Sequence, residues 1–295
     1  MVSLKQLKYA QTVAETLHFK KAANICNISQ SALSTAITQL ENQLNTTIFE
    51  RDNKKVLLTP TGKKIIDYAE KILSQINDLK HIADTDNDIS KVSLSIGMIP
   101  TIAPYILPKF MPIIHKRYPQ SKIQIYEEQS HKLVEKVKKG QLDTAILALP
   151  YPIDGLLAME FHQEDFFWIL PKHKETIKPK NVNAKSITAH NLMLLQEGHC
   201  LKDHIVDVCN FNPSEHAYSI NASSINTLVE MVKSNMGTTL IPEMAIDQLI
   251  NENSPLTAIH LNETSPHRRI AFIVRPNYTR VVIIDLLINI CKEIL

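Results

Sequence analysis

The spacing of apolar residues near the start of the chain most strongly limits how it can fold. Three short segments with helical spacing follow one another closely, at residues 4–17, 19–26 and 33–44. Asn27 and Ile28 form a tight break before the third segment, and Ser29 then stands where it can cap that helix. These segments are too short and too close to be separate domains, so we predict one three-helix module.

One face of the third helix is polar and uncharged. Its hydrogen-bonding side chains are Gln30, Ser31, Ser34, Thr35 and Thr38. Such side chains on a helix in the major groove can contact base edges and phosphates. Periodicity alone is equally consistent with a three-helix module whose polar face is merely solvated.

Basic residues follow the third helix and favour a polyanionic partner. Arg51, Lys54 and Lys55 precede the short apolar run 56–58, as in a basic hairpin or wing. The first 64 residues hold nine Lys or Arg and four Asp or Glu, whereas the rest of the chain carries a small net negative charge. An electropositive end on a nearly neutral body is typical of a segment that binds nucleic acid.

A longer fourth helix is predicted to begin at Thr59, as the cap, and Pro60. Apolar residues recur along it in the steps of a heptad seam: Ile65, Ala69, Ile72, Ile76, Leu79 and Ala83. A seam of this kind needs a cover. The cover could be the protein's own body or the same helix of a second chain.

After the polar stretch 83–91, where we place a domain boundary, strand and helix signals alternate. This order predicts an α/β fold with a mostly parallel sheet. The first half has expected strands at 92–96, 123–125 and 142–149, and expected helices at 102–118 and 133–139. The second half has expected strands at 166–170, 193–195, 217–220, 238–241 and 270–274, and expected helices at 224–233 and 281–294. Three prolines, Pro104, Pro108 and Pro112, are expected to break or kink the helix over 102–118.

The stretch 197–210 holds two of the chain's four cysteines, Cys200 and Cys209. His199 and Lys202 flank Cys200, and imidazolium or ammonium neighbours favour the reactive thiolate. The segment between the cysteines is long enough to bring them together if it is not locked as a helix, because positions i and i+9 of a helix point to different faces. The pair could therefore be apart in one state and joined in another.

The chain shows neither a signal peptide nor a run of apolar residues long enough for a membrane span, so we expect a cytoplasmic protein. In that compartment thiols are kept reduced, and four scattered cysteines do not form a disulfide framework. A functional cysteine pair there would be reactive or would bind a metal.

Several sequence blocks in one order resemble the winged helix-turn-helix of LysR-type transcriptional regulators: residues 19–23, 29–34, 37–41, 49–51 and 58–62. Two residues depart from the family pattern, Ser31 where proline is frequent and Asn45 where glycine is frequent. The resemblance implies a DNA-binding domain over 1–59 and a dimerising helix over 60–88. It also implies a periplasmic-binding-protein-like effector domain over 89–295, with subdomain I at 89–163 and 268–295 and subdomain II at 164–267. The helix would dimerise through Ile65, Ala69, Ile72, Ile76 and Leu79.

Other segments resemble the peroxide-sensing OxyR branch of that family over essentially the whole chain: residues 99–101, 130–131, 198–203, 209 and 268–276. The resemblance implies that Cys200 reacts with hydrogen peroxide and that Cys209 resolves the product as a disulfide, which a cytoplasmic thiol reductant later reduces. It places the peroxide pocket at Thr101, Ser130, His131, His199, Asp203 and Arg269, with Arg268 adjacent. Ser130 replaces a threonine and keeps the hydroxyl, and Lys202 replaces an arginine and keeps only the charge.

The resemblance also implies the partners: double-stranded promoter DNA, RNA polymerase and further copies of the chain in a homodimer or homotetramer. We expect no cofactor, no metal, no membrane and no enzymatic role. Three alternatives stay open. His199, Cys200, His204 and Cys209 could bind zinc or copper; the cleft could bind a metabolite; or the chain could be a thiol peroxidase, for which a DNA-reading module would be superfluous.

Overall fold

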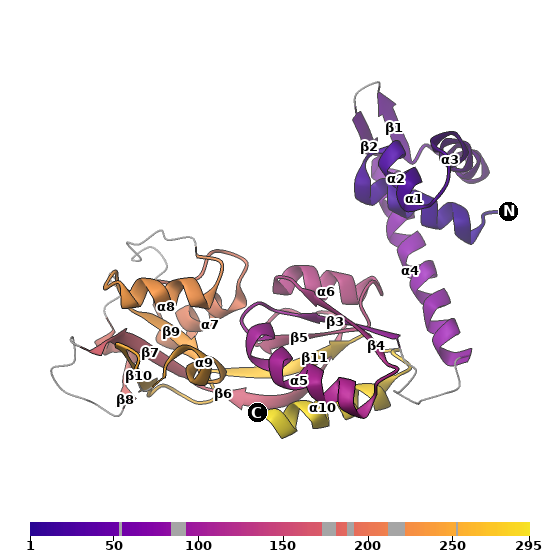
Figure 1. Cartoon of the computed structure of the whole chain (residues 1–295). Helices are drawn as coiled ribbons and strands as arrows, with labels where there is room; N and C mark the ends of the chain where they lie inside the picture. Colours follow the sequence, from indigo (N-terminus) through magenta and orange to yellow (C-terminus); the bar gives the residue numbers. More distant parts are fainter. Residues whose placement is uncertain (53–54, 84–92, 173–180, 188–191, 212–221, 252) are drawn as a thin grey trace. The chain divides into compact units, whose positions relative to one another are not determined.

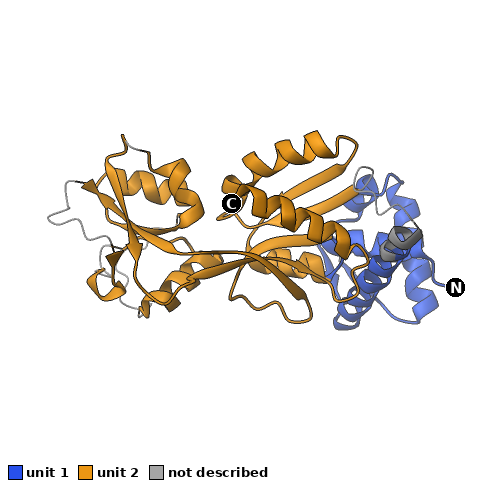
Figure 2. Cartoon of the chain, turned by 90° about the horizontal axis from the view of Figure 1, so that it is seen from below, with its two compact units in different colours: residues 1–85, 139–141 blue, residues 86–138, 142–295 orange. Residues whose placement is uncertain are grey.

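The structure, a computed structural model of the 295-residue chain, describes residues 1–52, 55–83, 93–172, 181–187, 192–211, 222–251 and 253–295 (Figure 1). The chain divides into two compact units, which Figure 2 shows in different colours. One unit comprises residues 1–85 with 139–141, and the other comprises residues 86–138 with 142–295. The predicted boundary lies almost wholly in residues 84–92, outside the described part.

The first unit is a winged helix-turn-helix followed by a long helix, as predicted. Its elements are α1 (Leu4–Thr16), α2 (Phe19–Ile25), α3 (Gln30–Leu44), β1 (Phe49–Asp52), β2 (Lys55–Leu58) and α4 (Pro60–Ala83). Both predicted caps are present. Ser29 Oγ accepts a hydrogen bond from the Ala32 amide at 3.1 Å, and Thr59 Oγ1 accepts one from the Gly62 amide at 2.8 Å.

The core of this unit is formed where α1, α2 and α3 meet, around Leu7, Ala10, Leu33 and Ile37. Helix α4 adds Ile66 and Ala69 to the same cluster. Asn45, the departure from the family pattern, ends α3 with a left-handed φ of 49°. Asparagine tolerates this conformation better than most residues, which explains how it can replace glycine there.

The second unit contains two sheets. The first has the strand order β4-β3-β5-β11-β6. Its strands are β3 (Ser93–Met98), β4 (Lys122–Glu127), β5 (Thr144–Leu149), β6 (Leu157–Glu164) and β11 (Arg268–Val274). Strand β3 runs parallel to β4 and β5, whereas β11 is antiparallel to β5 and β6. Helix α6 (Ser130–Lys138) packs on β5 and β11, and α5 (Ala103–Arg117) packs beside α10 (Val281–Ile294) (Figure 1).

The second sheet has the order β8-β10-β7-β9. Its strands are β7 (Phe166–Pro171), β8 (Asn181–Val182), β9 (Thr239–Pro242) and β10 (Leu256–Leu261). Its helical segments are η3 (Ala184–Ser186), α7 (Cys200–Cys209), α8 (Ile225–Lys233), η6 (Glu243–Ala245) and α9 (Ile246–Leu249). Each sheet has its own apolar core, so the unit consists of two α/β halves. No helix in the described ranges is both long and apolar enough to cross a bilayer.

Some expectations for this unit were wrong. The expected break in α5 is not present: the helix is continuous through Pro108 and Pro112. Both prolines are exposed, so the carbonyl groups that lose an amide partner can be hydrated. The sheets are mixed, because β11 and the unpredicted strands β6 and β10 pair antiparallel. Residues 193–195 form no strand but lie between two isolated bridges, at Leu192 and Leu195. The strand expected at 217–220 lies outside the described residues.

Candidate functional site

Helix α7 carries a cysteine at each end: Cys200 is its first residue and Cys209 its last. At 1.5 Å per residue the two Cα atoms are about 13 Å apart along the helix axis, and the side chains point to opposite faces. A disulfide needs Cα atoms within about 7 Å of each other. All four cysteines are free. The structure therefore shows the arrangement in which the pair is apart.

The two cysteines also belong to different cores. Cys200 is buried in the core of the first sheet, whose members include Ile99 and Ile102. Cys209 is buried in the core of the second sheet, whose members include Leu201 and Ile205 of the same helix. Helix α7 thus links the two halves of the unit.

The surroundings of Cys200 act on its acidity in opposite directions. Burial raises the pKa of the thiol, whereas the Ser130 hydroxyl and the positive charge of Arg268 lower it. The Ser130 hydroxyl lies close enough to favour the thiolate, yet its oxygen is buried and has no hydrogen bond of regular geometry with any described residue. The amino terminus of α7, where Cys200 lies, also favours a negative charge.

The cation next to Cys200 comes from the distant strand β11. Arg268 is fully buried, and its Nη1 and Nη2 lie 3.3 Å from Thr101 Oγ1 and Thr101 O, respectively. Arg269 instead lies with 42% of its side chain exposed and pairs with Glu160 at 2.6 Å. Neighbouring residues of a strand point to opposite faces. The expectation that Arg269 faces the pocket was therefore wrong, and Arg268 occupies that place.

The sequence neighbours of Cys200 do not supply the positive charge that we expected from them. Burial lowers the pKa of His199, which favours its neutral form. The Lys202 ammonium pairs with the Glu197 carboxylate instead of the thiol. Asp203 has an exposed side chain whose negative charge raises the pKa of Cys200. His131 is exposed at the start of α6, whereas Thr101, Ser130 and Cys200 are buried.

His204 lies one helical turn after Cys200. Its Nε2 is 2.8 Å from the Pro150 carbonyl oxygen. A carbonyl can only accept, so Nε2 carries the hydrogen and donates it; the buried Nδ1 then has no partner among the described residues. Burial lowers the pKa of His204 to about 4, against the effect of the Pro150 hydrogen bond, which raises it. The folded protein therefore keeps this imidazole neutral.

We expect the free energy of unfolding to decrease as the pH falls from about 6.5 to about 4. In this window His204 takes up a proton in the unfolded protein, where its pKa is 6.5, but stays neutral in the folded protein, where its pKa is about 4. The loss for this residue is about 3 kcal/mol over that window. Burial of His199 and His267 acts in the same direction. A His204→Gln variant can still donate to Pro150 and does not titrate, so its urea midpoint should depend less on pH. Equal pH dependence in the variant and the parent would contradict this assignment.

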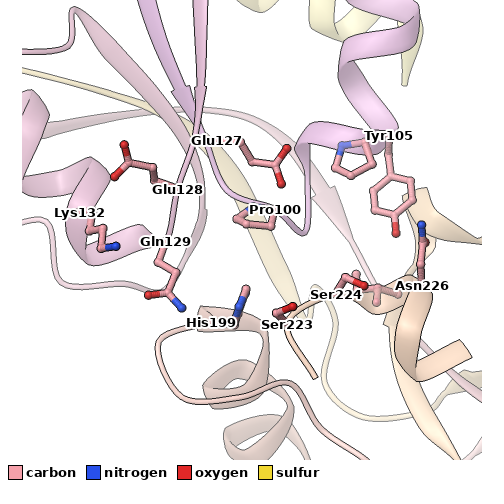
Figure 3. A pocket seen from close by; sticks show the side chains of 12 residues that line it. Pro100, Tyr105, Glu127, Glu128, Gln129, Lys132, His199, Ser223, Ser224 and Asn226 are labelled. Carbon is pink, nitrogen blue, oxygen red and sulfur yellow. The ribbon is translucent and has the colours of Figure 1, made fainter. Parts of the chain in front are cut away.

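A cavity of about 430 Å³ lies beside the start of α7 (Figure 3). Its walls come from both halves of the unit and include Pro100, Tyr105, Gln129, Lys132, His199, Ser223, Ser224 and Asn226. Pro100 and Gln129 follow the carboxyl ends of β3 and β4, the expected place for a ligand in an α/β sheet. The volume is in the usual range for small-molecule sites. His199 borders the cavity, whereas Cys200 does not.

The metal-site alternative has no support in the described part of the chain. There, no three His, Cys, Asp or Glu residues lie together in a way that could hold a metal ion. Cys209, one of the four ligands considered, is at the far end of α7 from Cys200.

The predicted DNA-reading face lies on α3. Gln30, Ser31, Thr35 and Thr38 are exposed there, and Ser34 is half-buried. Arg51 of the wing lies over this face: its guanidinium donates to Ser34 Oγ at 3.0 Å and to Thr38 Oγ1 at 3.4 Å.

Arg51 also makes two contacts that fix the wing against the helices. It pairs with Glu41 at 3.0 Å and stacks over the Phe19 ring at 4.7 Å. Arg51 therefore holds the wing against α3. Lys55 is exposed, and Lys54 lies outside the described residues.

The predicted seam of α4 is only partly covered by its own unit. Ala69 is buried, and Ile65 packs against the core of the winged helix. Farther along, Ile72 is 40% exposed and Leu79 is 60% exposed, with Ile76 half-buried. The apolar stripe therefore continues beyond the part that packs on the chain's own domain.

Two protein families match this chain. Residues 4–63 match the family described as "Bacterial regulatory helix-turn-helix protein, lysR family", and residues 90–295 match "LysR substrate binding domain". The chain belongs to the LysR family of transcriptional regulators. It is accordingly a DNA-binding regulator rather than an enzyme.

Relatives of this LysR-type regulator carry several different names. The HTH-type transcriptional regulator EstR of Acinetobacter baylyi is 37% identical over 99% of this chain and 97% of its own length. The DNA-binding transcriptional dual regulator OxyR of Escherichia coli is 29% identical over 93% of this chain and 90% of its own.

Solved structures of OxyR proteins share the fold. A full-length OxyR variant from Pseudomonas aeruginosa has a TM-score of 0.80 and 28% identity, covering 99% of this chain and 95% of that one. A Corynebacterium glutamicum OxyR variant with bound H2O2 has a TM-score of 0.67 and 31% identity, covering 99% of this chain and 92% of that one. The LysR-type regulator thus has the full-length fold of these OxyR proteins.

Proposed function

We propose that this LysR-family regulator senses hydrogen peroxide through Cys200. The observation that carries the proposal is the buried polar surroundings of this thiol: the Ser130 hydroxyl and the Arg268 guanidinium, which contacts Thr101, act on a cysteine at the amino terminus of α7. A second cysteine lies at the other end of the same helix. Two similar proteins add support, because one is a peroxide-inducible genes activator by name and one was solved with bound H2O2.

The residues supply the chemistry of a two-step oxidation. The Cys200 thiolate attacks one peroxide oxygen, the O–O bond breaks, and the leaving hydroxide takes a proton to become water. Ser130, Thr101 and Arg268 are donors that can stabilise the leaving oxygen. The resulting sulfenic acid condenses with the Cys209 thiol, releasing water and forming a disulfide. A thiol reductant later restores both thiols by exchange.

The disulfide would act on gene expression through the conformation of α7. The cysteines cannot meet while the helix is intact, so the bond favours a different arrangement of a segment that joins the two halves of the unit. We propose that this changes contacts within a homodimer or homotetramer, and thereby the position of the DNA-binding units on promoter DNA and their engagement of RNA polymerase.

DNA reading and dimerisation are proposed for the first unit. The exposed polar face of α3, with Gln30, Ser31 and Thr35, would enter the major groove of the DNA. Arg51, Lys54 and Lys55 would contact the sugar-phosphate backbone of the DNA. The apolar stripe of α4 that remains exposed, at Ile72 and Leu79, would pack on the same helix of a second chain.

Peptide mass spectrometry of the purified full-length protein tests the proposal. Stoichiometric peroxide is expected to produce a Cys200–Cys209 crosslink, which dithiothreitol removes, together with a changed promoter footprint. Oxidation confined to other residues, or no change in the footprint, would contradict it.

A second candidate is a regulator that responds to a small metabolite. The cavity of about 430 Å³ beside α7 favours it, as does the similarity to a regulator with a different name, EstR. A footprint that responds to a small acid and ignores peroxide would support this candidate instead.

A further inference from the structure

One buried cation lies between two groups that can each carry a negative charge. We propose that the Glu164 carboxylate competes with the Cys200 thiolate for the Arg268 guanidinium, and that this competition sets the reactivity of Cys200. The inference deepens the proposed peroxide sensing and rests on it for its biological meaning.

The Arg268–Glu164 pair is closed to solvent. Both side chains have no exposed surface, and Arg268 Nε donates to Glu164 Oε1 at 2.6 Å. The other carboxylate oxygen, Oε2, accepts from the Met244 amide at 2.9 Å. Both oxygens of Glu164 are thus engaged, which fixes the carboxylate on the Nε edge of the guanidinium.

The two terminal nitrogens of Arg268 point toward Thr101. They lie 3.3 Å from the Thr101 hydroxyl and 3.3 Å from its carbonyl oxygen. Thr101 is itself buried and directly precedes Ile102, which packs in the same core as Cys200. Helix α7 begins near the same strand ends: His204, one turn after Cys200, donates to the Pro150 carbonyl, and the preceding Leu149 pairs with Arg269 in the β5–β11 register. The guanidinium therefore has Glu164 at its Nε edge, while the start of α7 lies near the strand ends that carry Arg268.

Among the described residues, Arg268 is the one cation that lowers the pKa of Cys200, and Lys202 pairs with Glu197 instead. Helix α6 contributes the Ser130 hydroxyl, and β5 contributes the Ala148 backbone, which lowers the pKa of the thiol. Within α7, Asp203 raises that pKa, and burial lowers the pKa of His204 and of His199, which directly precedes the helix. Tyr151 follows β5, and burial, together with the negative charge of an ionised Cys200, raises its pKa.

Ionising Cys200 beside an ionised Glu164 would place two negative charges around a single buried positive charge. Like charges in a site of low polarity disfavour the second ionisation, so the thiol holds its proton more firmly. Glu164 would in this way keep resting reactivity low without occupying the peroxide-binding space.

A matched pair of variants tests the competition. Glu164→Gln removes the buried negative charge, and Glu160→Gln removes the partner of exposed Arg269 on the same two strands. The pH dependence of iodoacetamide alkylation at Cys200, followed by peptide mass spectrometry on the full-length protein, gives the pKa of the thiol. We expect the pKa of Cys200 to be about one unit lower in Glu164→Gln, which gives about tenfold more thiolate near neutral pH. Because a more acidic thiolate is intrinsically less nucleophilic, alkylation should be only about threefold faster. Glu160→Gln should match the parent protein.

A double variant shows whether the effect passes through Arg268. Glu164→Gln combined with Arg268→Met removes both charges, a replacement that buried ion pairs often tolerate. The double variant should be alkylated no faster than the parent. Alkylation as fast as in the single variant would overturn the proposal, and so would a Glu164→Gln protein that is folded but alkylated at the parental rate or more slowly.

If Glu164→Gln does not fold, Arg268→Lys decides the matter. An ammonium lacks the fork that serves two partners at once, so it should pair with Glu164 and leave the thiol slower to alkylate. An unchanged rate would overturn the proposal. The alkylation experiment uses no peroxide, so it tests the competition for Arg268 independently of peroxide sensing. If peroxide failed to oxidise Cys200 in the parent protein, the proposed sensing would be wrong, and the alkylation rates would still show whether Glu164 and Cys200 compete.

Discussion

A Cys200→Ser protein is expected to lose the peroxide response completely while retaining its affinity for promoter DNA. Serine has nearly the shape of cysteine, so the buried site around residue 200 should keep its packing. Its hydroxyl, however, does not ionise at neutral pH and cannot form a sulfenic acid. The DNase I footprint of the variant should be the same before and after peroxide, and the same as that of the reduced parent protein.

The chain offers a control for this substitution. Cys291 is buried in the core of the first sheet, as Cys200 is, and burial raises its pKa to about 12. Cys291→Ser should therefore be comparable in packing cost and should keep the full peroxide response. If Cys200→Ser still changed its footprint with peroxide, Cys200 would not be the sensor.

Oxidation by peroxide is expected to unfold helix α7. The cysteines are about 13 Å apart along the helix, and a disulfide requires Cα atoms within about 7 Å. Helical hydrogen bonds between residues 200 and 209 must therefore break. Amide hydrogen exchange over 202–209 should be slow in the reduced protein and approach the rate of an unstructured peptide in the oxidised one.

Cys209→Ser separates oxidation from crosslinking in the same experiment. Its Cys200 can still become a sulfenic acid but has no partner at the other end of the helix, so the α7 amides should stay protected after peroxide. A sulfenic acid probe should label this variant and not the oxidised parent. Loss of protection in Cys209→Ser would mean that the first oxidation step already disrupts the helix.

Melting α7 has an energetic cost that the disulfide must offset. Leu201 and Ile205 are 1% and 2% exposed in the helix. Exposing both side chains to water costs about 3–6 kcal/mol. The helical arrangement of α7 is accordingly the stable one as long as the two thiols are unlinked. Reduction of the proposed disulfide should therefore be enough for α7 to refold.

Local sequence patterns were sufficient to predict the winged helix-turn-helix. The caps at Ser29 and Thr59 and the apolar spacing of α1 and α3 act over a few residues, so they can be read without tertiary information. The same holds for α10, whose predicted range of 281–294 is the observed one. Helix α5 shows the limit, because two internal prolines did not break a helix whose outer face is solvated.

The electrostatics of the candidate site could not be predicted in the same way. Arg268 and Glu164 are more than a hundred residues apart in sequence, and they meet because β11 and β6 pair antiparallel at that register. Strand β6 was not predicted, since its residues show no clear alternation of buried and exposed positions. His204 had a visible signal, a histidine one turn after Cys200 on an apolar face, but its bond to Pro150 depends on the tertiary fold.

Because the two cysteines lie in separate cores, moving Cys200 out of its core and moving Cys209 out of its core differ in free-energy cost. If Cys200 withdraws, the space it leaves is bordered by polar groups, including the Ser130 oxygen that has no regular partner among the described residues. Water can enter such a space and hydrogen-bond there, whereas the apolar surroundings of Cys209 would leave a dry void. In the proposed disulfide formation, hydration therefore favours a path in which Cys200 moves and Cys209 stays in its core.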